Sequence, residues 1–374
     1  MNATLARALV VGGGIGGMSA AIALRQRGVA VDLVDIDPEW RVYGAGITIT
    51  GPTLRAFNRL GLIDAIAREG YFSDRVEFYS ADGILISTLD SPVLEPGIPA
   101  AGGILRPVLH RIMSERTVAD GTQVRLGVTV DGFVEDDDGV HVTFTDGTSG
   151  RYDAVIGADG SHSRLRARLF PGAPKLEFTG QGCWRILAPR PANVTCSQIW
   201  FGPECKLGMN PCSPDSMYMF ATTHMPGNPH VAEDQLLHGM RDILAPFGGD
   251  VAAVRAGLGP DSQPNYRPLF AMTLPAPWNI GRIGLIGDAV HPTTPHLATG
   301  AGLSVEDGIV LAEELMAADS VAEGWVRFTA RRLERARLVV ENSVQIGRFE
   351  QEGGRDSDVR DLMRLTTQAL AEPV

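Results

Sequence analysis

The chain has 374 residues, of which 44% are hydrophobic and 21% charged, and its formal net charge is −11 at pH 7. These values are typical of a globular protein with a sizeable core, and the length predicts two to three domains. The negative charge argues against nucleic acid or an anionic membrane surface as a partner, because a phosphate-binding surface needs a basic face. A basic groove for a single dinucleotide is still compatible with it.

The cysteines indicate a reducing compartment. Cys183, Cys196, Cys205 and Cys212 lie close together in the sequence without any C-x-x-C pair. This pattern is not a disulfide framework, and without paired spacing we expect no zinc or other metal site. No stretch offers the roughly 18 consecutive apolar residues that a membrane span needs. We therefore expect a cytoplasmic protein.

The first secondary-structure signal is a βαβ unit. Residues 7–11 form a short apolar run that predicts a strand, and 18–27 have helical spacing that ends at Gly28. Residues 29–35 alternate as in a second strand. The apolar start of the chain could also resemble a secretory signal peptide. Its glycine density favours a phosphate turn instead.

The rest of the chain predicts an α/β protein with an inserted sheet. Asp138-Gly139 and Asp146-Gly147 mark the turns of a three-stranded meander within 122–155. We expect strands or a β-rich region at 75–89, 176–223 and 283–286, and helices at 53–61, 106–119, 233–247, 304–317 and 325–352.

This order predicts a Rossmann-like βαβ domain built from separated segments, with a largely antiparallel β-sheet domain inserted between them. We assign the nucleotide-binding domain to 1–73, 101–175 and 276–318. The inserted, substrate-binding sheet takes 74–100 and 176–275. The segment 319–374 is predicted to be helical.

The glycine-rich turn that follows the first predicted strand carries the clearest chemistry. Gly12, Gly14 and Gly17 stand in a G-x-G-x-x-G pattern. Such glycines allow a tight turn, a close approach of the backbone to a pyrophosphate, and packing of the helix on the strand. Asp35, at the end of the second strand, is placed to accept the adenosine ribose hydroxyls. The motif alone does not distinguish FAD from NAD.

Two later segments combine an apolar strand with an aspartate and a glycine. Asp159-Gly160 follows the strand at 152–157, although a plain turn would use the same dipeptide. Gly287-Asp288 follows the strand at 283–286 and could bind ribityl hydroxyls, and the glycines of 300–302 open a helix whose N–H groups could face an anionic ring edge. His291 and His296 lie in the stiff loop between them and are more consistent with packing near a cofactor than with a metal.

Taken together, these motifs resemble those of the class A flavoprotein monooxygenases, the para-hydroxybenzoate hydroxylase-like aromatic hydroxylases. The resemblance runs from about Leu5 to Glu314. One departure is the sequence at 298–302, which lacks the Gln and Asn of the family's usual G-Q-G-x-N and leaves the flavin edge to backbone groups. From the sequence we also expect no counterpart of the C-terminal domain found in larger members. The resemblance implies FAD contacts from Gly12, Gly14, Ile15, Gly16, Gly17, Asp35, Arg41, Gly46, Ile47, Arg106, Asp159, Gly160, Gly287, Asp288, Pro295, Gly300, Ala301 and Gly302.

The resemblance also implies the reaction. NADH or NADPH would reduce FAD, dioxygen would add to the reduced ring, and a flavin hydroperoxide would transfer one oxygen atom to an activated aromatic or heteroaromatic substrate. The partners expected are therefore a small aromatic substrate and dioxygen, with the protein as a monomer or homodimer.

The residues on the substrate side carry a weaker signal. Two-residue alternation places Tyr218 and His224 on one strand face, where Tyr218 could orient a phenol and His224 could take its proton. Arg185 could pair with a substrate carboxylate, or instead form a structural salt bridge. A sheet-core role for Tyr218 and a solvent-edge role for His224 are the alternatives. The arginines of 327–337 are expected to form a solvated helix face.

Two other functions fit the same glycine turn. A flavin-dependent reductase or halogenase would share the scaffold, but the G-W-x-W-x-I-P signature of the halogenases is absent. An escort protein of the GDP-dissociation-inhibitor type would keep the turn without using a flavin. The motifs at Asp159 and Asp288 disfavour it.

Overall fold

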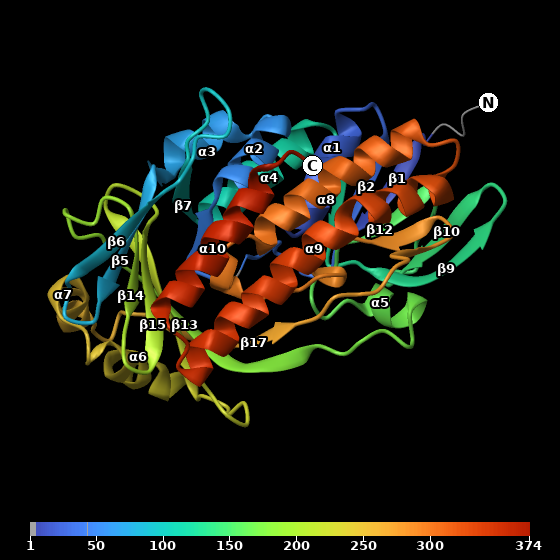
Figure 1. Ribbon diagram of the computed structural model, residues 1–374. Helices are drawn as coiled ribbons and strands as arrows, with labels where there is room; N and C mark the ends of the chain where they lie inside the picture. Colours follow the sequence, from blue (N-terminus) through green and yellow to red (C-terminus); the bar gives the residue numbers. More distant parts are fainter. Residues whose placement is uncertain (1–4, 43) are drawn as a thin grey trace.

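A computed structural model describes residues 5–42 and 44–374 of the chain. Figure 1 shows an elongated molecule in which one sheet lies near the N-terminus, a second sheet lies at the opposite end, and long C-terminal helices run along both. None of the helices in the described residues combines the length and the apolar character that crossing a bilayer requires.

The first sheet contains the predicted βαβ unit. β1 (Arg7–Val11) pairs in parallel with β2 (Ala30–Asp35) on one side and with β12 (Ala154–Gly157) on the other. Leu9 and Val10 are fully buried, as expected for a parallel strand with both faces covered. The sheet has the order β18-β19-β12-β1-β2-β8, with β8 (Gln123–Leu126), β18 (Asn279–Ile280) and β19 (Ile283–Leu285).

Helices cover this sheet and lead away from its strand ends. α1 (Ile15–Arg25) follows β1 and packs along α8 (Gly300–Ala317), so the first and third glycine-rich segments lie side by side. The remaining helices of this half are α2 (Gly51–Arg59), α3 (Ile63–Glu69), α4 (Arg106–Ala119) and α5 (Arg164–Leu169).

The second sheet has seven strands and is antiparallel except where β14 runs parallel to β5. One of its faces packs on α6 (Leu236–Leu244) and α7 (Gly249–Gly257) and buries the side chains of Trp184, Met219 and Leu207. Because side chains alternate along a strand, the neighbouring residues face the other way. In order, the strands are β17 (Asn265–Ala271), β13 (Glu177–Pro189), β16 (Ser216–His224), β15 (Cys205–Pro211), β14 (Ser197–Phe201), β5 (Arg75–Ser80) and β6 (Leu85–Asp90).

Two three-stranded sheets complete the fold. The predicted meander forms the antiparallel order β11-β10-β9, and the sheet of order β3-β7-β4 lies against β15 and β16 of the second large sheet. The predicted α/β class with an inserted, largely antiparallel sheet is confirmed. The strands of these sheets are β9 (Val130–Asp136), β10 (Gly139–Phe144), β11 (Ser149–Tyr152), β3 (Gly46–Ile49), β7 (Ala101–Leu105) and β4 (Tyr71–Ser73).

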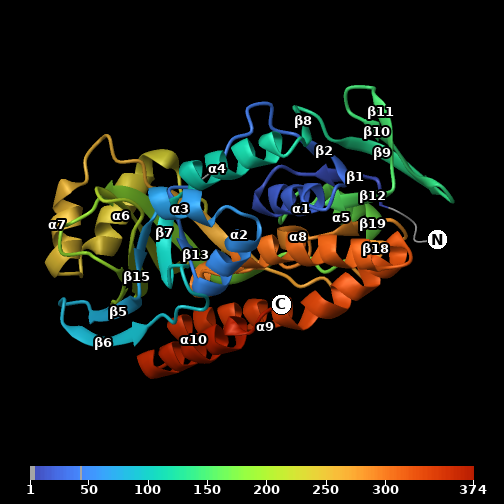
Figure 2. The same cartoon turned by 90° about the horizontal axis from the view of Figure 1, so that it is seen from above.

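Two C-terminal helices join the halves. α9 (Val321–Glu352) is continuous over 32 residues and ends at Gly353, whose φ of +70° suits glycine. α10 (Asp356–Ala371) then turns back along α9. In Figure 2, α9 begins beside the first sheet and α10 lies near the β5–β6 hairpin of the second.

We predict that Phe328→Ala destabilises the fold strongly. Phe328 is fully buried and its ring lies 5.6 Å from that of Trp325 and 5.7 Å from that of Trp278. Truncating such a side chain costs about 3–5 kcal/mol of unfolding free energy. Val326→Ala is the matched control, because Val326 is 59% exposed on the same helix. Urea unfolding of both variants tests this, and equal midpoints would contradict it.

Candidate active site

A cavity of about 940 Å³ lies between the two large sheets. Its wall begins at the turn after β1 with Gly13 and Gly14, and it continues to Arg185 and Tyr218 on the second sheet. Segments distant in the sequence therefore meet around one cavity. Its size and its mixed lining are those of a ligand site.

The turn after β1 is shaped for a phosphate. Gly12 has a φ of +108°, and a Cβ on either Gly12 or Gly17 would collide with backbone oxygen of a neighbouring segment. Around Gly14 there is open space where a ligand can approach. α1 begins at Ile15 without a side-chain cap or an acidic residue in its first turn. Its unpaired N–H groups therefore offer a site for a pyrophosphate.

Asp35 completes this end of the cavity. Its carboxylate accepts hydrogen bonds from the backbone N–H of Gly13 at 2.6 Å and of Asp37 at 2.7 Å, and it also lines the cavity. The Trp40 indole donates to the Gly13 carbonyl at 2.8 Å, which fixes the turn from outside. Arg41 lines the same end and is ion-paired with Asp37 at 2.9 Å. A ribose bound at Asp35 would follow a pyrophosphate held by α1.

The middle of the cavity is bordered by Arg106, Gly46 and Ile47, which all line it. The Arg106 side chain donates to the Gly46 carbonyl at 3.3 Å. Burial lowers the pKa of Arg106, and the nearby charge of Arg185 lowers it further. Two partly desolvated guanidinium groups in one region favour an anionic ligand between them.

The Asp159-Gly160 segment contributes its backbone to the cavity, but the Asp159 side chain does not line it. Asp159 accepts hydrogen bonds from the Ser163 hydroxyl at 2.6 Å and from the backbone N–H groups of Arg164 and Leu165, so its carboxylate holds the start of α5. Gly160 lines the cavity, whereas Asp159 is not among the lining residues. Of the two predicted contacts, the structure therefore places only Gly160 against the cavity.

Arg166 connects this segment by hydrogen bonds to the Gly287-Asp288 segment. Its guanidinium donates to the Ala289 carbonyl at 2.9 Å and to the Ser161 carbonyl at 2.7 Å. Gly287, with a φ of +61°, and Asp288 both line the cavity. Burial raises the pKa of Asp288, while the charges of His291 and Arg106 act in the opposite direction.

The N-terminus of α8 forms the wall beyond Asp288. Pro295, Gly300 and Ala301 line the cavity, and α8 has no side-chain cap or acidic residue in its first turn. Its free N–H groups can face an anionic ring edge. This is the arrangement expected when residues 298–302 lack the Gln and Asn side chains of the family's usual motif. Gly302 instead lies against Thr53 of α2, where a Cβ would collide with the hydroxyl. Its role is packing.

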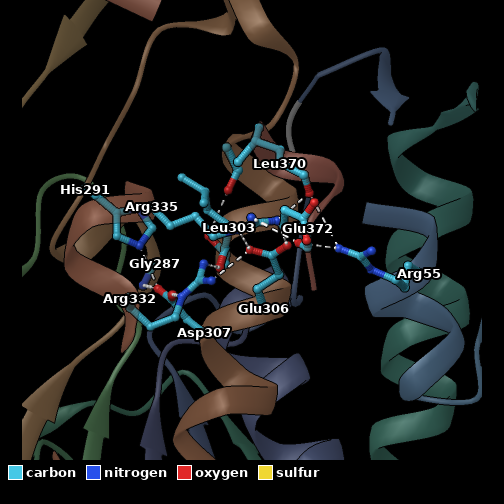
Figure 3. Close-up of polar contacts among 12 residues, drawn as sticks. Arg55, Gly287, His291, Leu303, Glu306, Asp307, Arg332, Arg335, Leu370 and Glu372 are labelled. Atoms are coloured by element: carbon cyan, nitrogen blue, oxygen red, sulfur yellow. Dashed lines mark hydrogen bonds and ion pairs between the residues drawn. The ribbon is translucent and has the colours of Figure 1, made fainter. Parts of the chain in front are cut away.

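A buried ionic network lies directly behind the Gly287 loop, as Figure 3 shows. The Asp307 carboxylate accepts from the Gly287 N–H at 2.8 Å and from the Arg332 side chain at 2.7 Å, and a 2.7 Å hydrogen bond joins it to His291. Burial alone would raise the pKa of Asp307, but His291 and Arg332 lower it to about 2. Asp307 is thus an anion that holds the loop in place.

This network corrects the prediction for the arginine-rich helix. Arg327 and Arg337 are exposed as expected, but the side chain of Arg332 is fully buried between Asp307 and Glu306. Arg335 also pairs with Glu306, at 2.8 Å. The density of charges along the sequence does not reveal that the face of α9 with Arg332 and Arg335 packs against α8.

On the second sheet, the structure separates the three predicted substrate residues. Arg185 and Tyr218 line the cavity, whereas His224 does not. His224 is exposed at the end of β16, and its ring nitrogen Nδ1 is 3.0 Å from the Gln351 side-chain oxygen. The predicted proton-accepting role of His224 therefore has no geometric basis, which agrees with the solvent-edge alternative.

The donor set fits FAD. Two uncapped helix N-termini, Asp35 and Asp288 are arranged along one cavity, as a pyrophosphate, a ribose, a ribityl chain and an anionic ring edge would require. Among the described residues, no group of three His, Cys, Asp or Glu side chains could hold a metal ion. The four cysteines are free.

Comparisons with known proteins agree with this assignment. A family model described as an FAD binding domain matches residues 6–183 and 271–343. The aurachin C monooxygenase/isomerase of Stigmatella aurantiaca is 31% identical over 354 residues, which cover 92% of this chain and 89% of that protein. The 3-amino-4-hydroxybenzoate 2-monooxygenase PtmB3 of Streptomyces platensis is 31% identical and covers 97% of this chain and 93% of its own.

A solved structure gives the same result for the fold. Klebsiella pneumoniae HpxO, complexed with FAD and uric acid, superposes with a TM-score of 0.84 at 26% identity and covers 99% of this chain and 93% of its own. Both sequence relatives are named as monooxygenases. These names favour a monooxygenase over a reductase or an escort protein.

We predict that Arg332→Met weakens both the fold and FAD binding. The substitution leaves the Asp307 carboxylate buried without its arginine counter-ion, which costs about 3–5 kcal/mol. Because Asp307 also holds the Gly287 N–H, the loop that carries Asp288 should lose its position. Urea unfolding and the dissociation constant of FAD measure the two effects. Arg337→Met, at an exposed pair on the same helix, is the control, and the two variants behaving alike would refute the prediction.

Proposed function

Because the chain belongs to the FAD-binding-domain family of class A flavoprotein monooxygenases, we propose that it hydroxylates a small, anionic aromatic or heteroaromatic substrate, with FAD as cofactor and with NADH or NADPH and dioxygen as co-substrates. The observation that carries the choice of substrate is Arg185, a cation on the cavity wall without a counter-ion among the described residues.

The cofactor's place follows from the donors already described. The first turn of α1 and Asp35 would bind the adenosine diphosphate half, and Asp288 with the start of α8 would bind the flavin half. When bound and reduced, FAD supplies the activated oxygen atom from dioxygen. The protein's own contribution is to bind the substrate beside it, to orient the ring and to exclude water.

Arg185 would bind the substrate's negative charge. It lies on β13, opposite Phe220 of β16, and both side chains line the cavity. Within residues 5–42 and 44–374, no carboxylate is hydrogen-bonded or ion-paired to the Arg185 guanidinium, so the alternative of a structural salt bridge has no partner. Arg106 adds further positive charge nearby. A carboxylate or an acidic ring would satisfy this site.

Tyr218 would orient the substrate by hydrogen bonding. Its side chain is buried, its hydroxyl lies 2.6 Å from the Thr48 hydroxyl, and its ring packs against Gly46. Burial raises the pKa of Tyr218 to about 12. The phenol therefore keeps its proton at working pH, so that it can share hydrogen bonds with a substrate oxygen but does not act as a base.

A direct experiment tests the whole proposal. Purified protein should be yellow, and hydroxybenzoates or hydroxypyridines that bind should stimulate NADH or NADPH oxidation. Labelled dioxygen should then place one labelled oxygen atom in the organic product, as seen by mass spectrometry. Stimulated oxidation that yields only hydrogen peroxide with every anionic aromatic compound would overturn the proposal.

We predict that Arg185→Ala raises KM for the anionic substrate about 10- to 100-fold, because a charge-assisted hydrogen bond contributes about 1.5–3 kcal/mol. Arg185→Lys, which keeps the charge but not the planar fork, should recover part of this loss. Steady-state kinetics and the FAD dissociation constant should be measured together. Arg337→Ala is the surface control. An unchanged KM in Arg185→Ala would remove Arg185 from the site.

We predict that Tyr218→Phe lowers kcat/KM by about 2- to 10-fold, the value of one hydrogen bond. With a folded pKa of about 12, Tyr218 stays protonated throughout the working range. The loss should therefore be the same at every pH from about 6 to 10, and the pH profile should keep its shape. A basic limb that disappears in the variant would show that the phenol titrates in that range.

A further inference from the structure

The cavity extends well beyond the space that a single aromatic ring needs beside Arg185. Its far part is lined by side chains of the second sheet, of the segment after β6, and of α10. We name this part the apolar arm and define it by Val76, Phe78, Leu89, Leu94, Ile199 and Met363.

The strand register shows how far the arm extends. Arg185 of β13 is opposite Phe220 of β16, which is opposite Gly208 of β15. Gly208 is opposite Ile199 of β14, and Ile199 is opposite Phe78 of β5. These residues form one row across five strands. At about 4.8 Å between neighbouring strands, Phe78 lies roughly 19 Å from Arg185 along the sheet.

The character of the row changes from charged to apolar along this path. Arg185 stands at one end, and Phe220, Ile199 and Phe78 follow it on the cavity wall. Gly208 leaves room for the Phe220 ring, because a Cβ there would collide with it. One end of the row can therefore hold an anion, while the rest offers only apolar contacts.

The opposite wall of the arm is built by α10, through Met363 and Ala371. The end of this helix is held firmly. Arg55 donates to the Ala371 carbonyl at 2.6 Å. Arg335 donates to the Leu370 carbonyl at 2.8 Å (Figure 3). The arm is thus bounded on both sides by anchored elements and is part of the folded structure.

Polar residues lie beside this row, two positions along the same strands, and limit what the arm can accept. Ser197 and Asn210 line the adjacent part of the cavity, and Asn210 is buried with its side-chain amide nitrogen unpaired in the described structure. Asp90, which follows Leu89 in the chain, and Thr367 of α10 also line the cavity. Because Asp90 would repel a second negative charge, a chain in this arm should end without a carboxylate.

We propose that the substrate carries, opposite its anionic group, an apolar substituent such as an alkyl chain that occupies the apolar arm. The inference rests on the proposed function, since it places the ring between Arg185 and the arm. It adds a substrate class to that function, an anionic aromatic ring with a neutral, apolar side chain. Selectivity for that chain comes from Phe78, Ile199 and Met363.

Equilibrium binding to the FAD-loaded enzyme tests this without turnover. The probes are 4-n-alkylbenzoates from methyl to hexyl, in which the carboxylate and the chain lie at opposite ends of the ring. Binding is read from the change in the visible absorbance of the bound flavin. We expect affinity to rise about fourfold for each added methylene, equal to about 0.8 kcal/mol, until the arm is filled.

Ile199→Trp should fill the arm and abolish the gain from methyl to hexyl. Met363→Trp does the same from the opposite wall and serves if Ile199→Trp does not fold. Ile86→Trp is the matched control, since Ile86 is 44% exposed on β6 and lies outside the cavity lining, and it should keep the full gain. Chain-length dependence that survives in both arm variants would overturn the proposal.

A second series separates this inference from the proposed function. 4-n-Alkylphenols lack the carboxylate but keep the chain. A chain-length gain in the phenols, combined with no preference for the benzoates, would support the arm while rejecting the anionic site at Arg185. Affinity independent of chain length in both series would reject the arm, whatever the result for Arg185.

Discussion

The buried ion pair between Asp307 and Arg332 holds the cofactor side of the structure together. Neither side chain is exposed, so each charge is acceptable because it is paired, Arg332 with Asp307 and Glu306, and Asp307 with Arg332 and His291. Asp307 uses its second oxygen for the Gly287 N–H and for His291, so the loop that carries Asp288 is fixed from behind. Glu306, the adjacent residue, extends the same network through Arg335 to the end of α10. One set of charges thus connects the flavin side of the cavity with the wall of the apolar arm.

In the second large sheet, side chains alternate between the core face, which stabilises the fold, and the cavity face, which would contact the substrate. Trp184 and Ile186 of β13 point toward α6 and α7 and belong to the core, while Arg185 between them faces the cavity. The same holds on β16 for Met219 and its neighbours Tyr218 and Phe220. Residues on the cavity face can therefore change without disturbing the core on the other face. Substrate preference in such a protein can vary while the fold stays constant.

Much of the fold and of the cofactor site could be predicted, because the signals are local. The glycine turn at Gly12–Gly17 and Asp35 are parts of one βαβ unit, and their geometry depends on a few neighbouring residues. Asp159 shows the limit of this reasoning. An aspartate after a strand suits both a ligand and a helix start, and only the hydrogen bonds to Ser163 and Arg164 distinguish them.

The roles of His224 and Arg332 depend on tertiary contacts. Alternation correctly gave His224 the same strand face as Tyr218, but it does not say where the cavity ends along that face, and His224 lies beyond it. Arg332 stands among exposed arginines, and its burial follows from the packing of α9 on α8. No sequence signal points to the apolar arm, because its residues come from β5, β6, the segment after β6, β14 and α10. Each is an ordinary apolar residue in the sequence, and their common place on the wall of one cavity becomes visible only in the folded structure.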